Sequence, residues 1–145
     1  MHATGEWTVG FQTRLEDGRG HIVTVDLPLD EHGRDLGPSA LELNVMSLAG
    51  CISTIFALVA KARHLRFDAL RVTLDAERPK GAPTISAVSG EVRVTTRAPA
   101  AEVETAVEFT LRTCPVGVIF ERAQIPLRIR TVVLPPLGSA LTPRA

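Results

Sequence analysis

Hydrophobic and polar residues alternate along two stretches near the start of the chain, which is the pattern of β-strands. Residues 6–14 and residues 21–27 are rich in strand-forming side chains. Residues 16–20, Glu-Asp-Gly-Arg-Gly, lie between them and contain the Asp-Gly pair that favours a tight turn. These segments therefore predict a β-hairpin. Residues 28–37 are polar and rich in turn formers, which indicates a loop.

Apolar residues then recur at intervals of three and four, which indicates a helix from about Ser39 to about His64. Ser39 and Glu42 have the spacing of a capping box, in which each side chain accepts a hydrogen bond from the other residue's backbone N–H. Gly50 is expected to bend this helix. Because most of the circumference is apolar, we expect a sheet and a further element, from this subunit or a second one, to wrap around it. The repeating apolar positions are Leu41, Val45, Leu48, Ile52, Ile55 and Val59.

The second half of the chain has a similar order of patterns. Residues 70–76 and 85–96 predict two strands, and a turn rich in Pro and Gly separates them. Residues 99–114 predict a second helix, with a proline and two glutamates near its start, where the helix dipole favours acidic side chains. Pro115 lacks the N–H that a continuing helix needs, so we expect a break at Cys114.

Residues 127–133 predict a last strand, which completes the order ββ-α-ββ-α-β. Antiparallel strands with two helices make an α+β domain. The chain has 145 residues, which suits a single domain. We therefore expect one domain over residues 1–145, with residues 134–145 as a loosely held tail.

The chain has 16 Lys and Arg and 16 Asp and Glu, so its formal net charge is zero. This balance argues against a protein that binds nucleic acid through general electrostatic attraction. The most apolar stretch, residues 41–62, contains Glu42, Asn44 and Lys61, so we interpret it as a core helix and expect no membrane span. The first residues do not resemble a signal peptide, and a cytoplasmic location is expected, where thiols stay reduced.

Two cysteines carry the clearest chemical signal in the sequence. Cys51 follows a glycine within the apolar helix, and Cys114 precedes Pro115 at the end of the second helix. A cysteine is a nucleophile as the thiolate, which an apolar helix disfavours, so a reactive Cys51 requires a cation such as an arginine held by a carboxylate. If the two sulfurs meet, a thiol redox enzyme is indicated. If they do not, both cysteines are packing residues, since free cysteine is among the most buried residue types.

Other motifs that carry chemistry are missing from the sequence. The four histidines do not have the spacing of a metal site, and there is no phosphate-binding loop, dinucleotide fingerprint or nucleophile-elbow serine. The histidines are His2, His21, His32 and His64.

The residues around both cysteines resemble the motifs of one family. Gly37-Pro-Ser-Ala-Leu-Glu-Leu, followed by Leu48-Ala-Gly-Cys51, resembles the first-cysteine signature of the OsmC/Ohr family of osmotically induced and organic hydroperoxide resistance proteins. Cys114-Pro-Val resembles the second-cysteine motif of the same family. The resemblance implies an OsmC-like fold, an intertwined homodimer in which antiparallel sheets surround two long central helices.

The resemblance also implies a thiol-dependent peroxidase that reduces organic hydroperoxides. Cys51 is expected to attack the peroxide and become a sulfenic acid, which Cys114 converts to a disulfide. A dithiol of the lipoyl type is expected as the external reductant, with no metal, haem or other bound cofactor. In this family an arginine from the N-terminal hairpin activates the first cysteine, which indicates Arg19, with Arg14 as the alternative.

The carboxylate partner of that arginine is expected to be Glu42, which fits the general OsmC-like branch better than the classical hydroperoxide resistance subgroup. Glu42 lies nine residues before Cys51. In a straight helix this separates them by about 13 Å and half a turn, so a bend at Gly50 or a bridging arginine is needed to join them in one site.

Two other functions suit parts of the same sequence. A non-catalytic OsmC-like homodimer would bind a small apolar ligand at the subunit interface. A hot-dog-type thioesterase also has a long apolar helix within a sheet, although the second helix ending in Cys-Pro argues against it.

Overall fold

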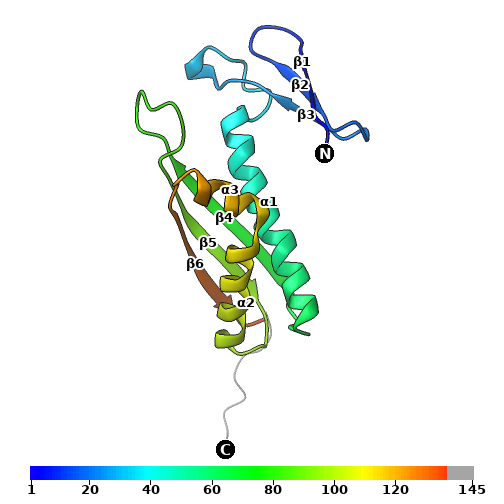
Figure 1. Ribbon diagram of the computed structural model, residues 1–145, viewed down its shortest axis with the longest axis vertical. Helices are drawn as coiled ribbons and strands as arrows, with labels where there is room; N and C mark the ends of the chain where they lie inside the picture. The colour runs from blue at the N-terminus through cyan, green and yellow to red at the C-terminus, as the bar shows by residue number, and fades with distance from the viewer. Residues whose placement is uncertain (137–145) are drawn as a thin grey trace, which may run out of the picture. The chain divides into compact units, whose positions relative to one another are not determined.

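The computed structural model describes residues 1–136, in which the chain forms two compact units (Figure 1). The N-terminal unit is Met1–Met46, and the C-terminal unit begins at Ser47, so helix α1 (Ala40–Ala62) contributes to both. The single domain over residues 1–145 stays a prediction. Of the expected tail, residues 137–145 lie outside the described residues, and Leu134 is the last residue of a strand.

The N-terminal unit contains a three-stranded antiparallel sheet of strands β1 (Thr4–Trp7), β2 (Thr13–Glu16) and β3 (Ile22–Val25) in that order. The hairpin expected around the Asp-Gly turn is present as β2 and β3. The single strand expected over residues 6–14 is wrong, because a turn divides it into β1 and β2.

Local hydrogen bonds explain this turn. Gly10 has a positive φ of 59°, which L-residues with side chains rarely adopt. The Trp7 indole N–H donates to the carbonyl of Gly10 at 2.9 Å, and the Thr8 N–H donates to the carbonyl of Gln12 at 3.0 Å. The alternating side chains of residues 6–14 therefore belong to two paired strands.

A buried carboxylate organises the loop after β3. Asp26 is 2% exposed. Its carboxylate accepts hydrogen bonds from the backbone N–H groups of Leu27, Arg34 and Leu36 and from the Gln12 side chain. Burial alone raises the pKa of this carboxyl group, but these four bonds outweigh it and hold the pKa of Asp26 below its ordinary value. The loop includes a 3₁₀ turn at Leu29–Glu31. The Asp26 carboxylate thus fixes the position of this loop beside the sheet.

We expect Asp26→Asn to lower the thermal unfolding midpoint by about 5 °C at pH 7, because an amide N–H₂ would face N–H donors. The lowered pKa stabilises the folded protein at every pH above about 4, and this stabilisation is lost as the pH falls through the folded-state pKa. The wild-type midpoint should therefore approach that of Asp26→Asn below pH 4. Circular dichroism measures both, with the exposed Asp30→Asn as control; a midpoint equal to that of wild type at pH 7 would contradict the role of Asp26.

Helix α1 begins as its sequence predicts. The Ser39 N–H donates to the Glu42 carboxylate at 2.7 Å, and the Glu42 N–H donates to the Ser39 hydroxyl at 3.2 Å. This confirms the capping box. The helix is continuous through Gly50. By length and composition alone, α1 is also the one helix within residues 1–136 that could cross a membrane, with a mean hydropathy of 2.0 and 28% of that window buried; core helices of soluble proteins meet this criterion too.

The C-terminal unit contains a three-stranded sheet in the order β4 (Ala69–Glu77), β5 (Ala87–Thr95) and β6 (Leu127–Leu134). The β4 and β5 strands are antiparallel, whereas β5 and β6 are parallel, so the expectation of wholly antiparallel sheets is wrong here. The chain crosses from β5 to β6 through helices α2 (Ala100–Thr113) and α3 (Pro115–Arg122). A helical crossover returns the chain to the same end of the sheet, which produces a parallel pair.

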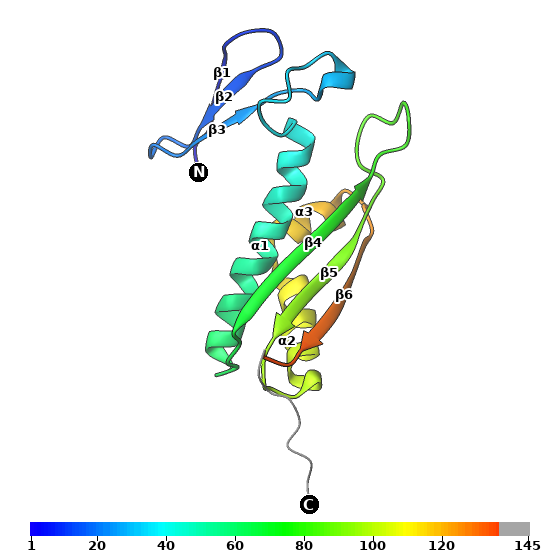
Figure 2. The ribbon, with the colours of Figure 1, turned by 180° about the vertical axis from the view of Figure 1, so that it is seen from behind.

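One face of this sheet carries the core. Figures 1 and 2 show α2 and the C-terminal part of α1 on the same face of the sheet. Side chains on that face of β5 and on both helices are fully buried, whereas the other face carries Ser89, Glu91 and Arg93. The fully buried side chains are Leu48, Ile52, Phe56, Val88, Val92, Val94, Val103, Val107, Thr110 and Cys114. The mixed arrangement of helices and sheets confirms the α+β fold class.

Candidate active site

Cys114 occupies the junction between two helices. Helix α2 ends at Thr113, and α3 begins at Pro115, where a proline without an N–H is favoured in the first helical position. Cys114 itself is extended, with φ −65° and ψ 112°, as the residue before a proline prefers. The expected break at Cys114 is therefore confirmed, and it makes this cysteine the N-terminal cap of α3.

The Cys114 thiol is fully buried and held in one position. Its Sγ accepts a hydrogen bond from the Gly117 N–H at 3.3 Å, and its exposed fraction is 0%. The Cys51 side chain lies close enough to interact with this thiol and to shift its pKa. Cys51 is half-buried on α1, between the fully buried Leu48 and Ile52. The fold thus brings together two thiols from separate helices, and both are free, not joined as a disulfide.

The surroundings of Cys114 favour the protonated form of its thiol. Burial is the main cause, and the interaction with Cys51 the second, of a pKa of Cys114 that is raised to about 11. The Gly117 N–H favours the thiolate but is outweighed. Cys114 therefore keeps its proton at neutral pH and can donate an S–H bond to the Cys51 sulfur.

We expect iodoacetamide to alkylate Cys114 at least about tenfold more slowly than an ordinary thiol at pH 8, because a pKa near 11 leaves about 0.1% thiolate at that pH. Peptide mapping of the reduced protein over time measures the rate at each cysteine. In urea, where the burial is lost, both cysteines should react alike. Equal rates in the folded protein would contradict the buried, protonated state of Cys114.

The predicted activating arginine lies in the turn between β2 and β3. The Arg19 guanidinium donates to Oδ2 of Asp17 through Nε at 2.9 Å and through Nη2 at 2.8 Å. His21 Nδ1 contacts the same oxygen at 2.8 Å. The His21 ring and the Arg19 N–H groups hold the pKa of Asp17 well below its ordinary value, and the Asp17 carboxylate raises the pKa of His21.

The other two predicted groups have partners of their own. Arg14 forms an ion pair with Glu16 at 2.8 Å. The Glu42 carboxylate accepts from the Ser39 N–H, which is the main cause that lowers the pKa of Glu42. Within the N-terminal unit as described, Arg19 and Glu42 are not bonded to each other. The structure therefore pairs the two cysteines and pairs Arg19 with Asp17, a residue that the sequence indicated only as a turn former.

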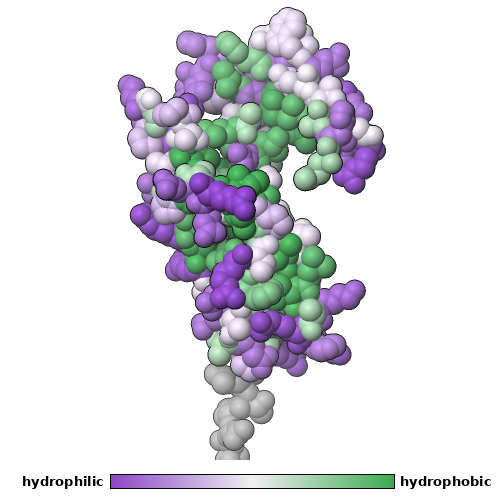
Figure 3. Space-filling view, viewed as in Figure 1, coloured by the Kyte–Doolittle hydropathy of each residue, from purple (hydrophilic) through white to green (hydrophobic). Residues whose placement is uncertain are grey.

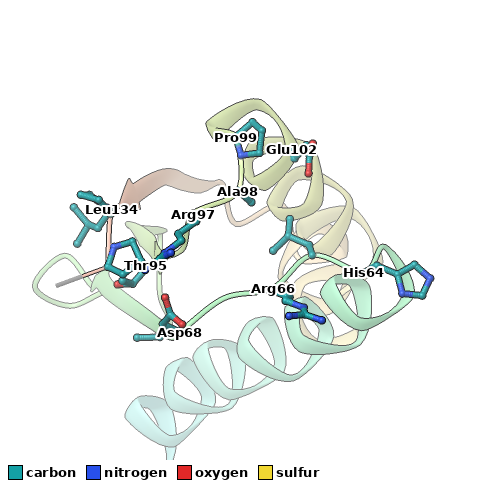
Figure 4. A pocket seen from close by; sticks show the side chains of 13 residues that line it. His64, Arg66, Asp68, Thr95, Arg97, Ala98, Pro99, Glu102 and Leu134 are labelled. Atoms are coloured by element: carbon teal, nitrogen blue, oxygen red, sulfur yellow. The ribbon is translucent and has the colours of Figure 1, made fainter. Parts of the chain in front are cut away.

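A cavity of about 1050 Å³ lies at the other end of α2 from Cys114 (Figure 4). Its wall includes the oppositely charged side chains of Arg66, Asp68, Arg97 and Glu102, together with Pro99 before the helix. Helix α2 has 14 residues, so about 20 Å separates its two ends. The cysteine pair is not part of this wall. Among the described residues there is also no group of three or more His, Cys, Asp or Glu side chains that could hold a metal ion.

Comparison with known proteins identifies the family of this chain. The family model for OsmC-like proteins matches residues 32–130, which include both cysteines. No curated protein matches the chain by sequence. The family match covers more than half of the chain and confirms the resemblance seen in its cysteine motifs.

Solved structures share the fold over nearly the whole chain. A structure from structural genomics has a TM-score of 0.83 at 22% identity, covering 94% of this chain and 100% of that one. An OsmC-like protein from Mycoplasma pneumoniae has a TM-score of 0.80 at 14% identity, covering 91% and 95%. An organic hydroperoxide resistance protein from Elizabethkingia anophelis has a TM-score of 0.73 at 18% identity, covering 91% and 94%. At these identities the similarity establishes the fold.

Proposed function

This chain belongs to the family of OsmC-like proteins, and we propose that it is a thiol-dependent peroxidase that reduces organic hydroperoxides. The observation that supports the proposal is the proximity of the Cys51 and Cys114 side chains, together with the burial that raises the pKa of Cys114. The organic hydroperoxide resistance protein that shares this fold supports the substrate class.

The first step is an attack by Cys51. Because Cys114 keeps its proton, the Cys51 sulfur is the nucleophile that remains. Its thiolate forms an S–O bond to the terminal oxygen of the hydroperoxide as the O–O bond breaks. The leaving alkoxide takes up a proton and departs as the alcohol. Cys51 is then a sulfenic acid, oxidised by two electrons.

Cys114 completes the second step. Its sulfur attacks the sulfenic sulfur of Cys51, an S–S bond forms, and the hydroxyl group leaves as water with the proton that Cys114 held. The two side chains are already close enough to interact in the reduced protein, which favours this step. A dithiol, for which we propose the lipoyl type, then reduces the disulfide by exchange and is itself oxidised to a cyclic disulfide.

A cation is needed to favour the Cys51 thiolate, and we assign this role to Arg19. Its side chain is 76% exposed and has N–H donors beyond those used by Asp17. A guanidinium stays charged at all relevant pH values and can donate to a thiolate or to a peroxide oxygen.

We also propose that the protein acts as a homodimer. Along the part of α1 in the C-terminal unit, Leu58 is 58% exposed, and the position of Gly50 faces open space. Figure 3 shows apolar surface along this stretch of the C-terminal unit. In the N-terminal unit Trp7 and Phe11 are 67% and 54% exposed. Exposed apolar side chains of this size are typical of a surface that another protein covers. A second copy of the chain is the partner that fits the family fold.

Light scattering after size-exclusion chromatography tests the dimer. We expect a mass of about twice 15.6 kDa for the wild type. For Leu58→Glu we expect the mass of one chain, because a charge would be buried against the partner. Leu134→Glu, at an exposed strand end, serves as control. A wild-type mass of one chain would exclude the homodimer.

A stoichiometric assay tests the function. Purified protein is incubated with cumene hydroperoxide and dihydrolipoic acid, and peroxide loss is followed together with the cumyl alcohol formed. We expect catalytic turnover with one alcohol per peroxide. If peroxide loss does not exceed that with dithiol alone, the proposed function is wrong.

A further inference from the structure

The cavity at the N-terminal end of α2 lies wholly within the C-terminal unit, and the proposed thiol chemistry does not use it. Its volume of about 1050 Å³ is at the upper end of the range in which proteins bind small ligands. Helix α2 has 14 residues, so about 20 Å separates this end of the helix from Cys114. The cavity is therefore a candidate binding site that is separate from the cysteine pair.

One buried hydroxyl group joins three segments that form the wall of this cavity. Thr96 is 4% exposed. Its hydroxyl donates to the Arg66 carbonyl and accepts from the Ala98 N–H at 3.0 Å, and its own N–H donates to the Leu134 carbonyl at 2.9 Å. The loop after α1, the loop before α2 and the end of β6 are thus fixed to one another. The protein itself therefore shapes the cavity, as is usual for ligand sites.

Four charged side chains in the described part of this wall do not pair with one another. They are the guanidiniums of Arg66 and Arg97 and the carboxylates of Asp68 and Glu102. Within residues 1–136 none of these four side chains forms a hydrogen bond or an ion pair. In Figure 4 Arg97 and Asp68 lie to one side of the cavity, and Arg66 and Glu102 lie to the other. Each side thus presents one cation and one anion to a ligand.

Apolar side chains line the same cavity. They include Leu65, Ala98, Pro99 and Leu134. Leu65 is buried, whereas Leu134 is 38% exposed and has apolar surface that a ligand can cover. A small polyanion such as phosphate would leave this surface uncovered and would face two carboxylates, and a wholly apolar molecule would leave four charges unpaired. The ligand that suits the whole wall has apolar side chains and one charge of each sign.

We propose that this cavity binds a short peptide that has free termini and apolar side chains. The terminal carboxylate accepts hydrogen bonds from a guanidinium on one side of the cavity, and the terminal ammonium donates to a carboxylate on the other side. The termini of an extended tripeptide lie about 10 Å apart, so they can reach two sides of a cavity at once, whereas both charges of a single amino acid lie on one carbon atom. The apolar side chains cover Leu65 and Leu134. This inference does not depend on the peroxidase activity.

A titration with trileucine, followed by two-dimensional ¹⁵N NMR, tests the site. We expect the amide signals of Leu65 and Ala98 to shift as one molecule binds per chain. N-Acetyl-trileucine and trileucine amide each lack one terminal charge and should bind about tenfold more weakly. The acetylated amide, which lacks both charges, should bind about a hundredfold more weakly. Shifts that do not appear with trileucine, equal binding of the doubly blocked peptide, or displacement of trileucine by inorganic phosphate would overturn the inference.

Two double variants test which wall residues meet each end of the peptide. Arg66→Gln/Arg97→Gln should bind trileucine about tenfold more weakly and no longer distinguish it from trileucine amide. Asp68→Asn/Glu102→Gln should likewise no longer distinguish trileucine from N-acetyl-trileucine. All four side chains are exposed, so we expect both variants to fold, with a thermal unfolding midpoint close to that of wild type.

The matched controls lie on the opposite face of the C-terminal sheet. Asp75 and Arg128 both pair in register with Ser89, on the face that α2 does not cover, and both are exposed. Arg128→Gln and Asp75→Asn should therefore retain the wild-type affinity for trileucine. A double variant that still distinguishes the free peptide from its blocked form, or control variants weakened as much as the double variants, would overturn the inference.

Discussion

Replacing Cys51 with serine is expected to slow the reduction of an organic hydroperoxide by at least about a thousandfold. A serine hydroxyl stays protonated near neutral pH, and its oxygen does not form the sulfenic acid through which the two electrons pass. The measurement is the initial rate of cumene hydroperoxide loss with dihydrolipoic acid in excess. Because Cys51 is half-buried and similar in size to serine, we expect the variant to fold, which circular dichroism verifies.

The control for this experiment lies on the same helix. Thr54 is exposed one helical turn after Cys51, and Thr54→Ser should retain the wild-type rate. Turnover by Cys51→Ser within tenfold of the wild-type rate would show that the sulfur of Cys51 is not the nucleophile. The non-catalytic alternative, in which the pocket of an OsmC-like homodimer binds an apolar ligand, is favoured instead if neither the wild type nor the variant turns over the peroxide.

Replacing Cys114 with serine is expected to separate the two chemical steps. Without reductant, both wild type and Cys114→Ser should consume about one hydroperoxide per chain, because the attack requires only Cys51. The wild type should then contain a disulfide and lose both free thiols. The variant should stop at the sulfenic acid, with a mass increase of about 16 Da and labelling by dimedone.

Mass spectrometry of the intact chain distinguishes these products. With a dithiol reductant we expect steady-state turnover of Cys114→Ser to fall by about tenfold or more, since the reductant must attack a sulfenic acid at a half-buried position. If the variant and wild type give the same oxidised product, Cys114 is a packing residue, and its contact with Cys51 has no part in the chemistry.

Much of the local structure could be predicted because its causes lie within a few residues. The capping box needs only Ser39 and Glu42, three residues apart. The helix break at Cys114 needs only the missing N–H of Pro115. The interruption of residues 6–14 was not predicted, since the side chains of that stretch alternate as in a strand and the turn depends on the positive φ of Gly10 and on pairing with the neighbouring strands.

The candidate site likewise has features that the local sequence predicts and features that depend on distant parts of the chain. The motifs around Cys51 and Cys114 mark both cysteines in the sequence, and the Asp-Gly turn marks the position of Arg19. The parallel pairing of β6 with β5, by contrast, depends on where the crossover helices return the chain to the sheet. The alternation of side chains along one strand carries no information about this.

By itself, the sequence determined the order of the helices, most strands and the identity of the two thiols, because propensity, capping and periodicity act over short distances along the chain. The tertiary structure alone decided that the two thiols lie close together, that burial raises the pKa of Cys114, and that the Arg19 guanidinium bonds the Asp17 carboxylate. These properties depend on desolvation and on contacts between side chains in three dimensions, and residue spacing does not contain either of them.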